Sequence, residues 1–374
     1  MIDFRYHIVS LISVFLALAV GIALGAGPLE ETIGDTLTGQ VEVLREEKDA
    51  LRAELDEAQS ALDRQNVYLE GAGPRLLEGT LTGRRVAVVS LGAVEEDERV
   101  GVEEQLTTAG ASISARVQVT DVWTDPTLRS FRQALGANLV TYLDSAPSPD
   151  AGAEVELAEA LAQGLTGADP AAPDQLSEPA GLVLELLASG DSELITVGEP
   201  VTAPADAVVV LAAESPEPDA DATPAPDEDG TEDAVAAYLA IVTAAQARSE
   251  GVLLAGGVAT PGDLVSTVLE DADLAAQIAT VTGFRGVTGQ ISVPLGLNAR
   301  IGGTVGHYGF GDGLTPVPEP VVLPAVDRTV AGAPAEPPAD GAARDDGAGA
   351  DAGAGADAGA DAGADAGADA GTDG

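Results

Sequence analysis

The chain has 374 residues, no cysteine, 17 basic and 62 acidic residues, and a formal net charge of −45. This acidic balance excludes nucleic acid and anionic lipid headgroups as partners of its surface, and the lack of cysteine excludes disulfides and thiolate sites. The length allows one or two domains with a substantial core beside terminal segments.

Residues 1–28 form a short N-terminus followed by an apolar stretch of membrane-spanning length. No charged residue interrupts residues 8–29, and Ser10 and Ser13 are its polar side chains. In a helix, about 20 residues cover the roughly 30 Å hydrocarbon core of a bilayer. A cleaved signal peptide is the alternative, because the small residues at 25–27 suit a cleavage site. We favour an uncleaved anchor, since the run is longer than a typical signal-peptide core and a helical pattern continues beyond it.

The charges that flank this stretch predict its orientation. Arg5 precedes the apolar run, whereas Glu30, Glu31 and Asp35 follow it. The positive-inside rule places the N-terminus in the cytoplasm and the rest of the chain outside. We therefore predict a single-pass protein of the cell membrane whose bulk is extracytoplasmic and lies in the cell envelope.

Residues 29–72 carry the heptad pattern of a coiled-coil stalk. The seam consists of Leu37, Val41, Leu44, Lys48, Leu51, Leu55, Leu62 and Leu69. Two chains that leave the same membrane side by side favour a parallel homo-oligomer, and a lysine at an a position favours a dimer. The alternative is a single amphipathic helix docked on its own domain. Pro74, in the glycine-rich stretch 71–74, is expected to end the helix.

Residues 75–315 predict a three-layer α/β domain with a mostly parallel sheet. Strand patterns occur at 84–91, 112–119, 194–197, 207–211, 251–255 and 277–282, and helical patterns at 95–110, 127–135, 154–165, 181–188, 232–249 and 262–269. Strands that are apolar on both faces and alternate with helices are typical of parallel sheets covered by helices. Two loops interrupt the pattern, at 144–150 and in the proline-rich acidic insertion 214–229.

The domain lacks the sequence motifs of common enzymes. It contains no nucleophile elbow, zinc-protease helix, phosphate-binding loop or dinucleotide fingerprint. The two histidines, His7 and His307, fall on opposite sides of the predicted membrane. Asp271 and Asp273 offer oxygen ligands to a hard cation, and glycines 256–257 offer room for a phosphate, although helix starts and turns are their commoner roles. We predict a protein that is not an enzyme.

The motif Gly306, His307, Tyr308 and Gly309 is the most specific short pattern in the domain. Glycines permit unusual backbone angles around the aromatic and imidazole side chains. In one interpretation the loop presents His307 to a metal or a partner. In the other, which we favour because no second chemical group accompanies it, the backbone passes close to the sheet for structural reasons.

Residues 316–374 form the C-terminal tail. The segment is rich in proline as far as residue 338 and then repeats aspartate, alanine and glycine. Such a composition cannot bury a core, so we predict disorder and the role of a spacer.

Several stretches resemble the actinobacterial family of mycobacterial copper transport protein B (MctB): residues 4–25, 83–89, 266–268 with Asp271 and Asp273, and 306–309. The resemblance spans about residues 1–315. It implies copper efflux or copper homeostasis in the cell envelope, with copper as the metal handled. Corynebacterial relatives imply an alternative, a non-catalytic coiled-coil scaffold that controls cell separation by engaging a peptidoglycan hydrolase of the cell wall. Cu(I) prefers thiolate and thioether ligands, and the chain offers Met1 alone. Copper handling is our predicted function, and the scaffold is its alternative.

Overall fold

The computed structural model describes residues 4–26, 28–190, 192–213, 228–260 and 262–328, with the side chains of 24–38 and 228–232 outside the description. Most of the predicted insertion, 214–227, and the tail from 329 also lie outside the described residues. The helices are α1 (Phe4–Ala26), α2 (Pro28–Leu77), α3 (Glu96–Thr108), α4 (Arg129–Leu139), α5 (Ala153–Thr166), α6 (Glu178–Leu187), α7 (Glu228–Arg248), α8 (Leu264–Glu270), α9 (Ala272–Ala275) and α10 (Val287–Ile301). The strands are β1 (Arg85–Leu91), β2 (Ser112–Val119), β3 (Ala168–Asp169), β4 (Ala172–Leu176), β5 (Ile195–Val197), β6 (Ala207–Ala212), β7 (Val252–Gly256), β8 (Ala279–Thr282) and β9 (His307–Tyr308).

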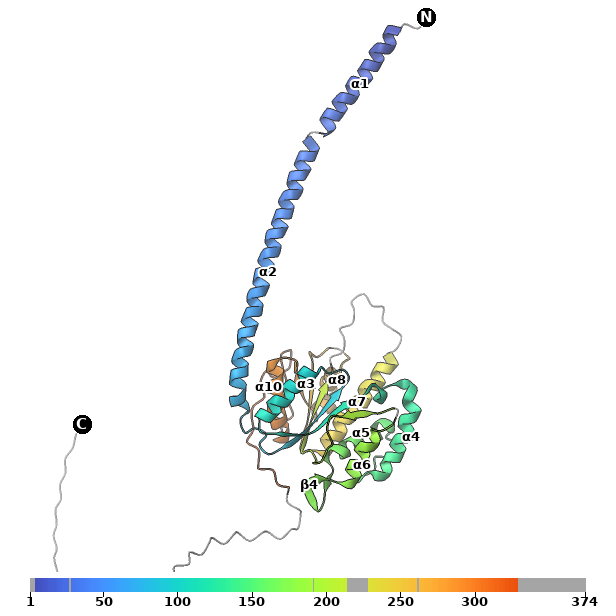
Figure 1. Ribbon diagram of the computed structural model, residues 1–374, viewed down its shortest axis with the longest axis vertical. Helices are drawn as coiled ribbons and strands as arrows, with labels where there is room; N and C mark the ends of the chain where they lie inside the picture. Colours follow the sequence, from blue (N-terminus) through green and yellow to red (C-terminus); the bar gives the residue numbers. More distant parts are fainter. Residues whose placement is uncertain (1–3, 27, 191, 214–227, 261, 329–374) are drawn as a thin grey trace, which may run out of the picture. The chain divides into compact units, whose positions relative to one another are not determined.

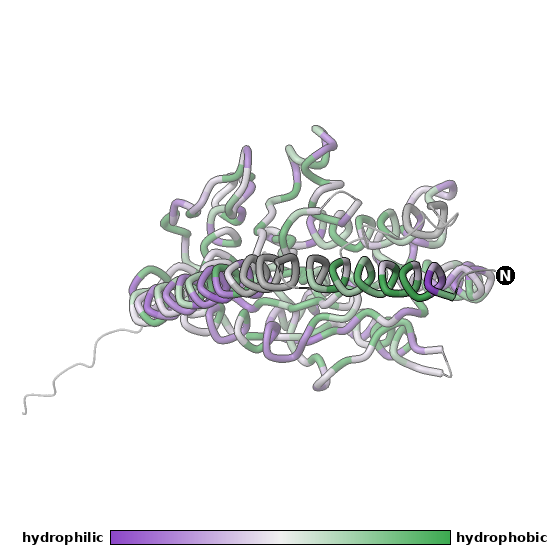
Figure 2. Tube along the Cα trace, turned by 90° about the horizontal axis from the view of Figure 1, so that it is seen from above, coloured by the Kyte–Doolittle hydropathy of each residue, from purple (hydrophilic) through white to green (hydrophobic). Residues whose placement is uncertain are grey.

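Helix α1 is long and apolar enough to span a membrane. Its segment Phe4–Ala23 has a mean hydropathy of 2.2, and none of it is buried inside the protein. The Ser13 hydroxyl donates to the Val9 carbonyl at 2.6 Å, so its polar group is satisfied within the helix, as a hydrocarbon environment requires. Figure 2 shows hydrophobic residues along most of α1 and mixed polarity along α2.

Helix α2 does not end at Pro74, and the predicted joint there is wrong. The helix runs for 50 residues through Pro74 to Leu77, and the Pro74 carbonyl accepts a hydrogen bond from the Glu78 backbone at 3.0 Å. Proline removes one helical hydrogen bond. The loss is offset because Leu77 is completely buried with residues of α3 and α10. The last turns of α2 therefore belong to the domain core.

The domain is built on a seven-stranded sheet in the order β5-β2-β1-β6-β7-β8-β9. All neighbours pair in parallel except β5, which lies antiparallel to β2 at the edge. Figure 1 shows α3 and α10 on one side of the sheet and α4, α5, α6 and α7 on the other. The mostly parallel α/β architecture predicted from the apolar runs is confirmed.

Two hydrophobic cores lie on the two faces of the sheet. Val86 and Val88 of β1 face the core shared with α3 and α10, whereas Ala87 and Val89 face the core shared with α5, α6 and α7. Strand β2 differs, because only alternate side chains along it are buried. The helical layer on the α3 side thus leaves β2 and β5 partly uncovered.

Residues 316–328 fasten the C-terminal side of the domain. The Asn298 side chain on α10 donates to the Thr80 carbonyl at 2.7 Å and to the Val321 carbonyl at 3.0 Å, and it accepts from the Val321 backbone at 2.6 Å. Arg328 donates to the Gly83 carbonyl at 2.8 Å and pairs with Asp206. This segment, defined as the strap, was expected to begin the disordered tail but makes these ordered contacts.

Replacing Asn298 tests the strap. The Asn298 side chain is fully buried, so Asn298→Ala leaves three backbone groups without partners and should lower the free energy of unfolding by about 3 kcal/mol. Denaturant unfolding followed by the fluorescence of Trp123, the chain's one tryptophan, measures this. The exposed Asn138 on α4 provides the control Asn138→Ala, and equal effects of the two variants would contradict the assignment.

Candidate functional site

The strand order defines where a ligand site is expected. In doubly wound sheets, ligands bind outside the carboxyl ends of the strands, at the point where the chain reverses its direction of winding. Here that point lies between β1 and β6, since β2 was added on one side of β1 and β6 on the other. A crevice of about 220 Å³ lies at this point. It is lined by Leu91, Gly92, Ala212, Ala213, Ala234, Val235, Tyr238, Gly262, Asp263 and Leu264.

The chemistry of this crevice is mainly apolar. The Asp263 carboxylate already caps α8, because it accepts hydrogen bonds from the backbones of Thr260 and Ser266, both at 2.6 Å. Burial raises the pKa of Tyr238, so its hydroxyl stays protonated. Among the described residues of the lining there is therefore no base and no activated nucleophile.

The motif around His307 forms the edge strand β9. Thr280 pairs with His307 and Val281 with Tyr308, in parallel with β8. Tyr308 is buried, and a side chain at Gly309, where φ is +141°, would collide with the Thr282 hydroxyl. The backbone thus approaches the sheet closely, as the structural interpretation predicts.

The polar contacts of His307 lie inside the domain. Its Nδ1 is 3.0 Å from the Thr280 hydroxyl oxygen, and its ring donates to the backbone carbonyl of Ala275. Burial lowers the pKa of His307 from its ordinary value of 6.5, an effect that the Ala275 carbonyl partly opposes. Throughout the described chain, no group of three His, Cys, Asp or Glu side chains is arranged to hold a metal ion.

The weaker sequence candidates have structural roles. Asp271 caps α9 by accepting hydrogen bonds from the backbones of Asp273 and Leu274, at 2.8 Å and 3.1 Å. The carbonyls of Gly256 and Gly257 both accept from the Gly283 backbone at 2.9 Å. These residues form a helix start and a turn rather than a convergent site.

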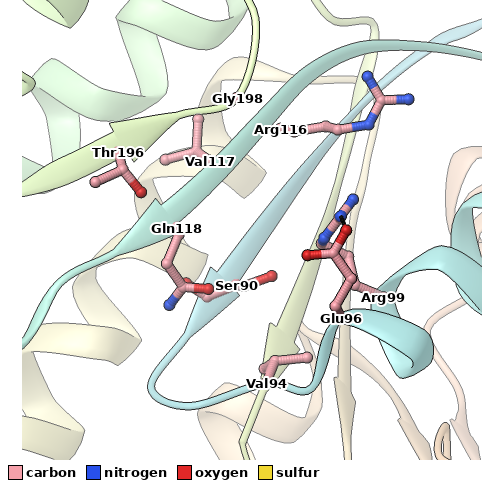
Figure 3. Close-up of a pocket in the computed structure, with 9 residues that line it drawn as sticks. All are labelled: Ser90, Val94, Glu96, Arg99, Arg116, Val117, Gln118, Thr196 and Gly198. Atoms are coloured by element: carbon pink, nitrogen blue, oxygen red, sulfur yellow. Dashed lines mark hydrogen bonds and ion pairs between the residues drawn. The ribbon is translucent and has the colours of Figure 1, made fainter.

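A second pocket, which the sequence did not indicate, lies where the α3 layer leaves β2 uncovered (Figure 3). We call it the arginine pocket, and its volume is about 300 Å³. It is lined by Ser90, Val94, Glu96, Arg99, Arg116, Val117, Gln118, Thr196 and Gly198. These residues come from β1, the start of α3, β2 and the β5 region, so no local motif could reveal it.

The predicted stalk seam is exposed on α2. Val41, Leu44, Leu51, Leu55 and Leu62 retain between 43% and 65% of their accessible surface. Leu69, the last member of the seam, instead packs against the domain core, and the side chain of Leu37 lies outside the described residues. Within the described part of the chain, no segment covers this row of exposed apolar side chains.

Together these features define a class of protein: an apolar N-terminal helix of spanning length, a long helix with an apolar seam, and a doubly wound α/β domain. The sequence profile described as "Copper transport outer membrane protein, MctB" matches residues 1–318. The chain therefore belongs to the MctB family.

Curated relatives agree with this assignment. The copper transporter MctB of Mycobacterium tuberculosis is 32% identical over 336 residues, which cover 85% of this chain and 99% of the relative, and that of Mycobacterium bovis matches equally. The copper transporter MctB of Mycobacterium leprae is 30% identical over 343 residues, which cover 86% of this chain and 100% of the relative. The family match to residues 1–318 includes α1, α2 and the sheet with its helices.

The lowered pKa of His307 predicts a pH dependence of stability. The folded protein favours the neutral imidazole, so its free energy of unfolding is highest above the ordinary pKa of 6.5. This free energy falls as the pH drops below 6.5 towards the lower pKa of His307 in the folded protein. Between about pH 7.5 and about pH 5.5, wild type should lose more stability than His307→Gln. Trp123 fluorescence in denaturant measures this, and His7→Gln on α1 is the control. Parallel pH profiles of wild type and His307→Gln would refute the assignment.

Proposed function

We propose that this protein handles copper in the cell envelope, with its N-terminus in the cytoplasm and its domain outside the membrane. The observation that carries the proposal is the match of residues 1–318 to a copper transport family whose curated members are named copper transporters. The single basic residue before the apolar run and the acids after it support the orientation.

The ligand chemistry supports a role within an assembly. Cu(I) prefers sulfur ligands, and the full sequence contains one methionine and no cysteine. His307 supplies one imidazole, and its Nδ1 already lies 3.0 Å from the Thr280 hydroxyl. We infer that copper handling depends on paired chains or on a partner that supplies further ligands.

The stalk supports pairing as a parallel dimer. Each exposed leucine of the seam removes apolar surface from water when a second copy packs against it, at roughly 25 cal/mol per Å². Arg52, at an e position, has only a weak internal ion pair with Asp49, at 3.7 Å and highly exposed, so it is available to Glu47 of a second chain.

Charges placed in the seam should separate the chains. Leu51→Glu combined with Leu55→Glu puts four like charges into the core of a dimer and should convert it to monomers, as measured by light scattering of the full chain in detergent. Ala53→Glu combined with Ser60→Glu, on the outer face of the same helix, should leave the dimer intact. A monomeric wild type, or equal behaviour of the two variants, would overturn the dimer.

A second candidate function is a non-catalytic scaffold that engages a peptidoglycan hydrolase during cell separation. The exposed seam of α2 favours it, because the same leucines are suited to a partner helix. The crevice between β1 and β6 is also consistent with a scaffold, since its described lining contains no base or activated nucleophile.

A deletion strain separates the two functions. If the protein handles copper, deletion should raise cellular copper and copper sensitivity while cells separate normally. Copper content by mass spectrometry, growth in copper and light microscopy of chaining are scored together. Complementation with Ala53→Glu combined with Ser60→Glu should restore tolerance, whereas Leu51→Glu combined with Leu55→Glu should not. Chained cells with normal copper content would reject copper handling in favour of the scaffold.

A further inference from the structure

The arginine pocket contains a buried hydroxyl without a partner. Ser90 is 1% exposed, and its Oγ has no hydrogen-bond partner among the described residues. Ser90 is registered with Gln118, and Val88 with Arg116, so all four side chains point to the α3 face of the sheet. In Figure 3 the Ser90 hydroxyl extends into the space between Gln118 and the Glu96–Arg99 pair. A buried hydroxyl left unpaired costs about 1–3 kcal/mol, so a group that enters the pocket and bonds to it recovers this energy.

Two guanidinium groups border the same space and share one buried carboxylate. Glu103 pairs with Arg99 and, at 2.8 Å, with Arg116, and its side chain is 10% exposed. Two positive charges thus face one buried negative charge, which leaves one positive charge in the triad. This residual charge is suited to one additional carboxylate.

The remaining partners of the two arginines are weakly held. Glu96 contacts Arg99 at 3.1 Å with 79% exposure, and Glu199 contacts Arg116 at 3.4 Å with 81% exposure. Exposed ion pairs of this kind contribute about 0–1 kcal/mol. A ligand carboxylate can therefore replace either glutamate at little cost.

We propose that the arginine pocket binds a small monocarboxylate that carries an amide, such as an N-acylated amino acid. Its carboxylate contacts Arg99 and Arg116, and one of its oxygens accepts a hydrogen bond from Ser90. Its amide lies near the polar side chains of Gln118 and Thr196, and its apolar part lies against Val94. The volume of about 300 Å³ is at the lower end of the range for ligand pockets, which limits the ligand to this size.

Titration calorimetry of the full chain in lipid nanodiscs tests the proposal with N-acetylalanine as the probe. N-acetylalaninamide, which has the same shape and no charge, should bind at least tenfold more weakly. Equal binding of the acid and the amide, or no binding of either at millimolar concentration, overturns the proposal.

Three variants sharpen this test. Ser90→Ala should weaken binding of N-acetylalanine about tenfold while leaving the melting temperature unchanged or higher, because an unpaired hydroxyl is removed. Glu96→Gln should strengthen binding severalfold by releasing Arg99, whereas the matched control Glu104→Gln, exposed on the same helix and outside the lining, should not. Unchanged affinity in both Ser90→Ala and Glu96→Gln would count against the pocket, and the melting temperatures separate lost binding from misfolding.

Discussion

The domain depends on a sheet whose central strands are shielded from water on both faces. Every residue of β6, β7 and β8 is buried, so each face requires a layer of helices. Helices α3 and α10 form one layer, and α5 and α7 contribute most of the buried helical residues of the other. The end of α2 is drawn into the first layer by Leu77. The attachment of the long helix is thus part of the same core and not a flexible joint.

Where this constraint relaxes, the surface becomes chemically different. Strand β2 is buried on one face alone, and its other face carries Arg116 and Gln118. The short antiparallel β5 closes the edge and adds Thr196. Polar side chains accumulate here because α3 covers this face only in part, whereas the crevice between β1 and β6 remains apolar. The arginine pocket therefore lies beside the usual ligand position of this fold.

The sequence predicted the elements whose patterns are local. The run 207–211 predicted β6 because a short apolar run rich in valine is typical of a buried strand. Helix α10 was missed, since Gly289, Pro294 and Gly296 are helix breakers by propensity. In the structure a Cβ at Gly289 would lie 2.1 Å from the Gly283 carbonyl oxygen, so close packing requires the glycine. The arginine pocket could not be predicted for another reason. Ser90 and Thr196 line the same pocket only because of the strand order, which the spacing of residues along the sequence does not reveal.

The net charge of −45 and the arginine pocket act over different distances. At physiological ionic strength, charges separated by more than about 8 Å are largely screened, so the acidic surface repels large polyanions mainly where many charges approach at once. A single carboxylate bound to Arg99 and Arg116 interacts with these two arginines and Glu103 at hydrogen-bonding distance, where salt screens the interaction only weakly. Glu96 and Glu199 then act as exchangeable occupants that keep the arginines paired while the pocket is empty. A chain with this surface can exclude nucleic acid and still select a small anion, because exclusion depends on the whole surface and selection depends on two partly buried arginines and the buried Ser90 hydroxyl.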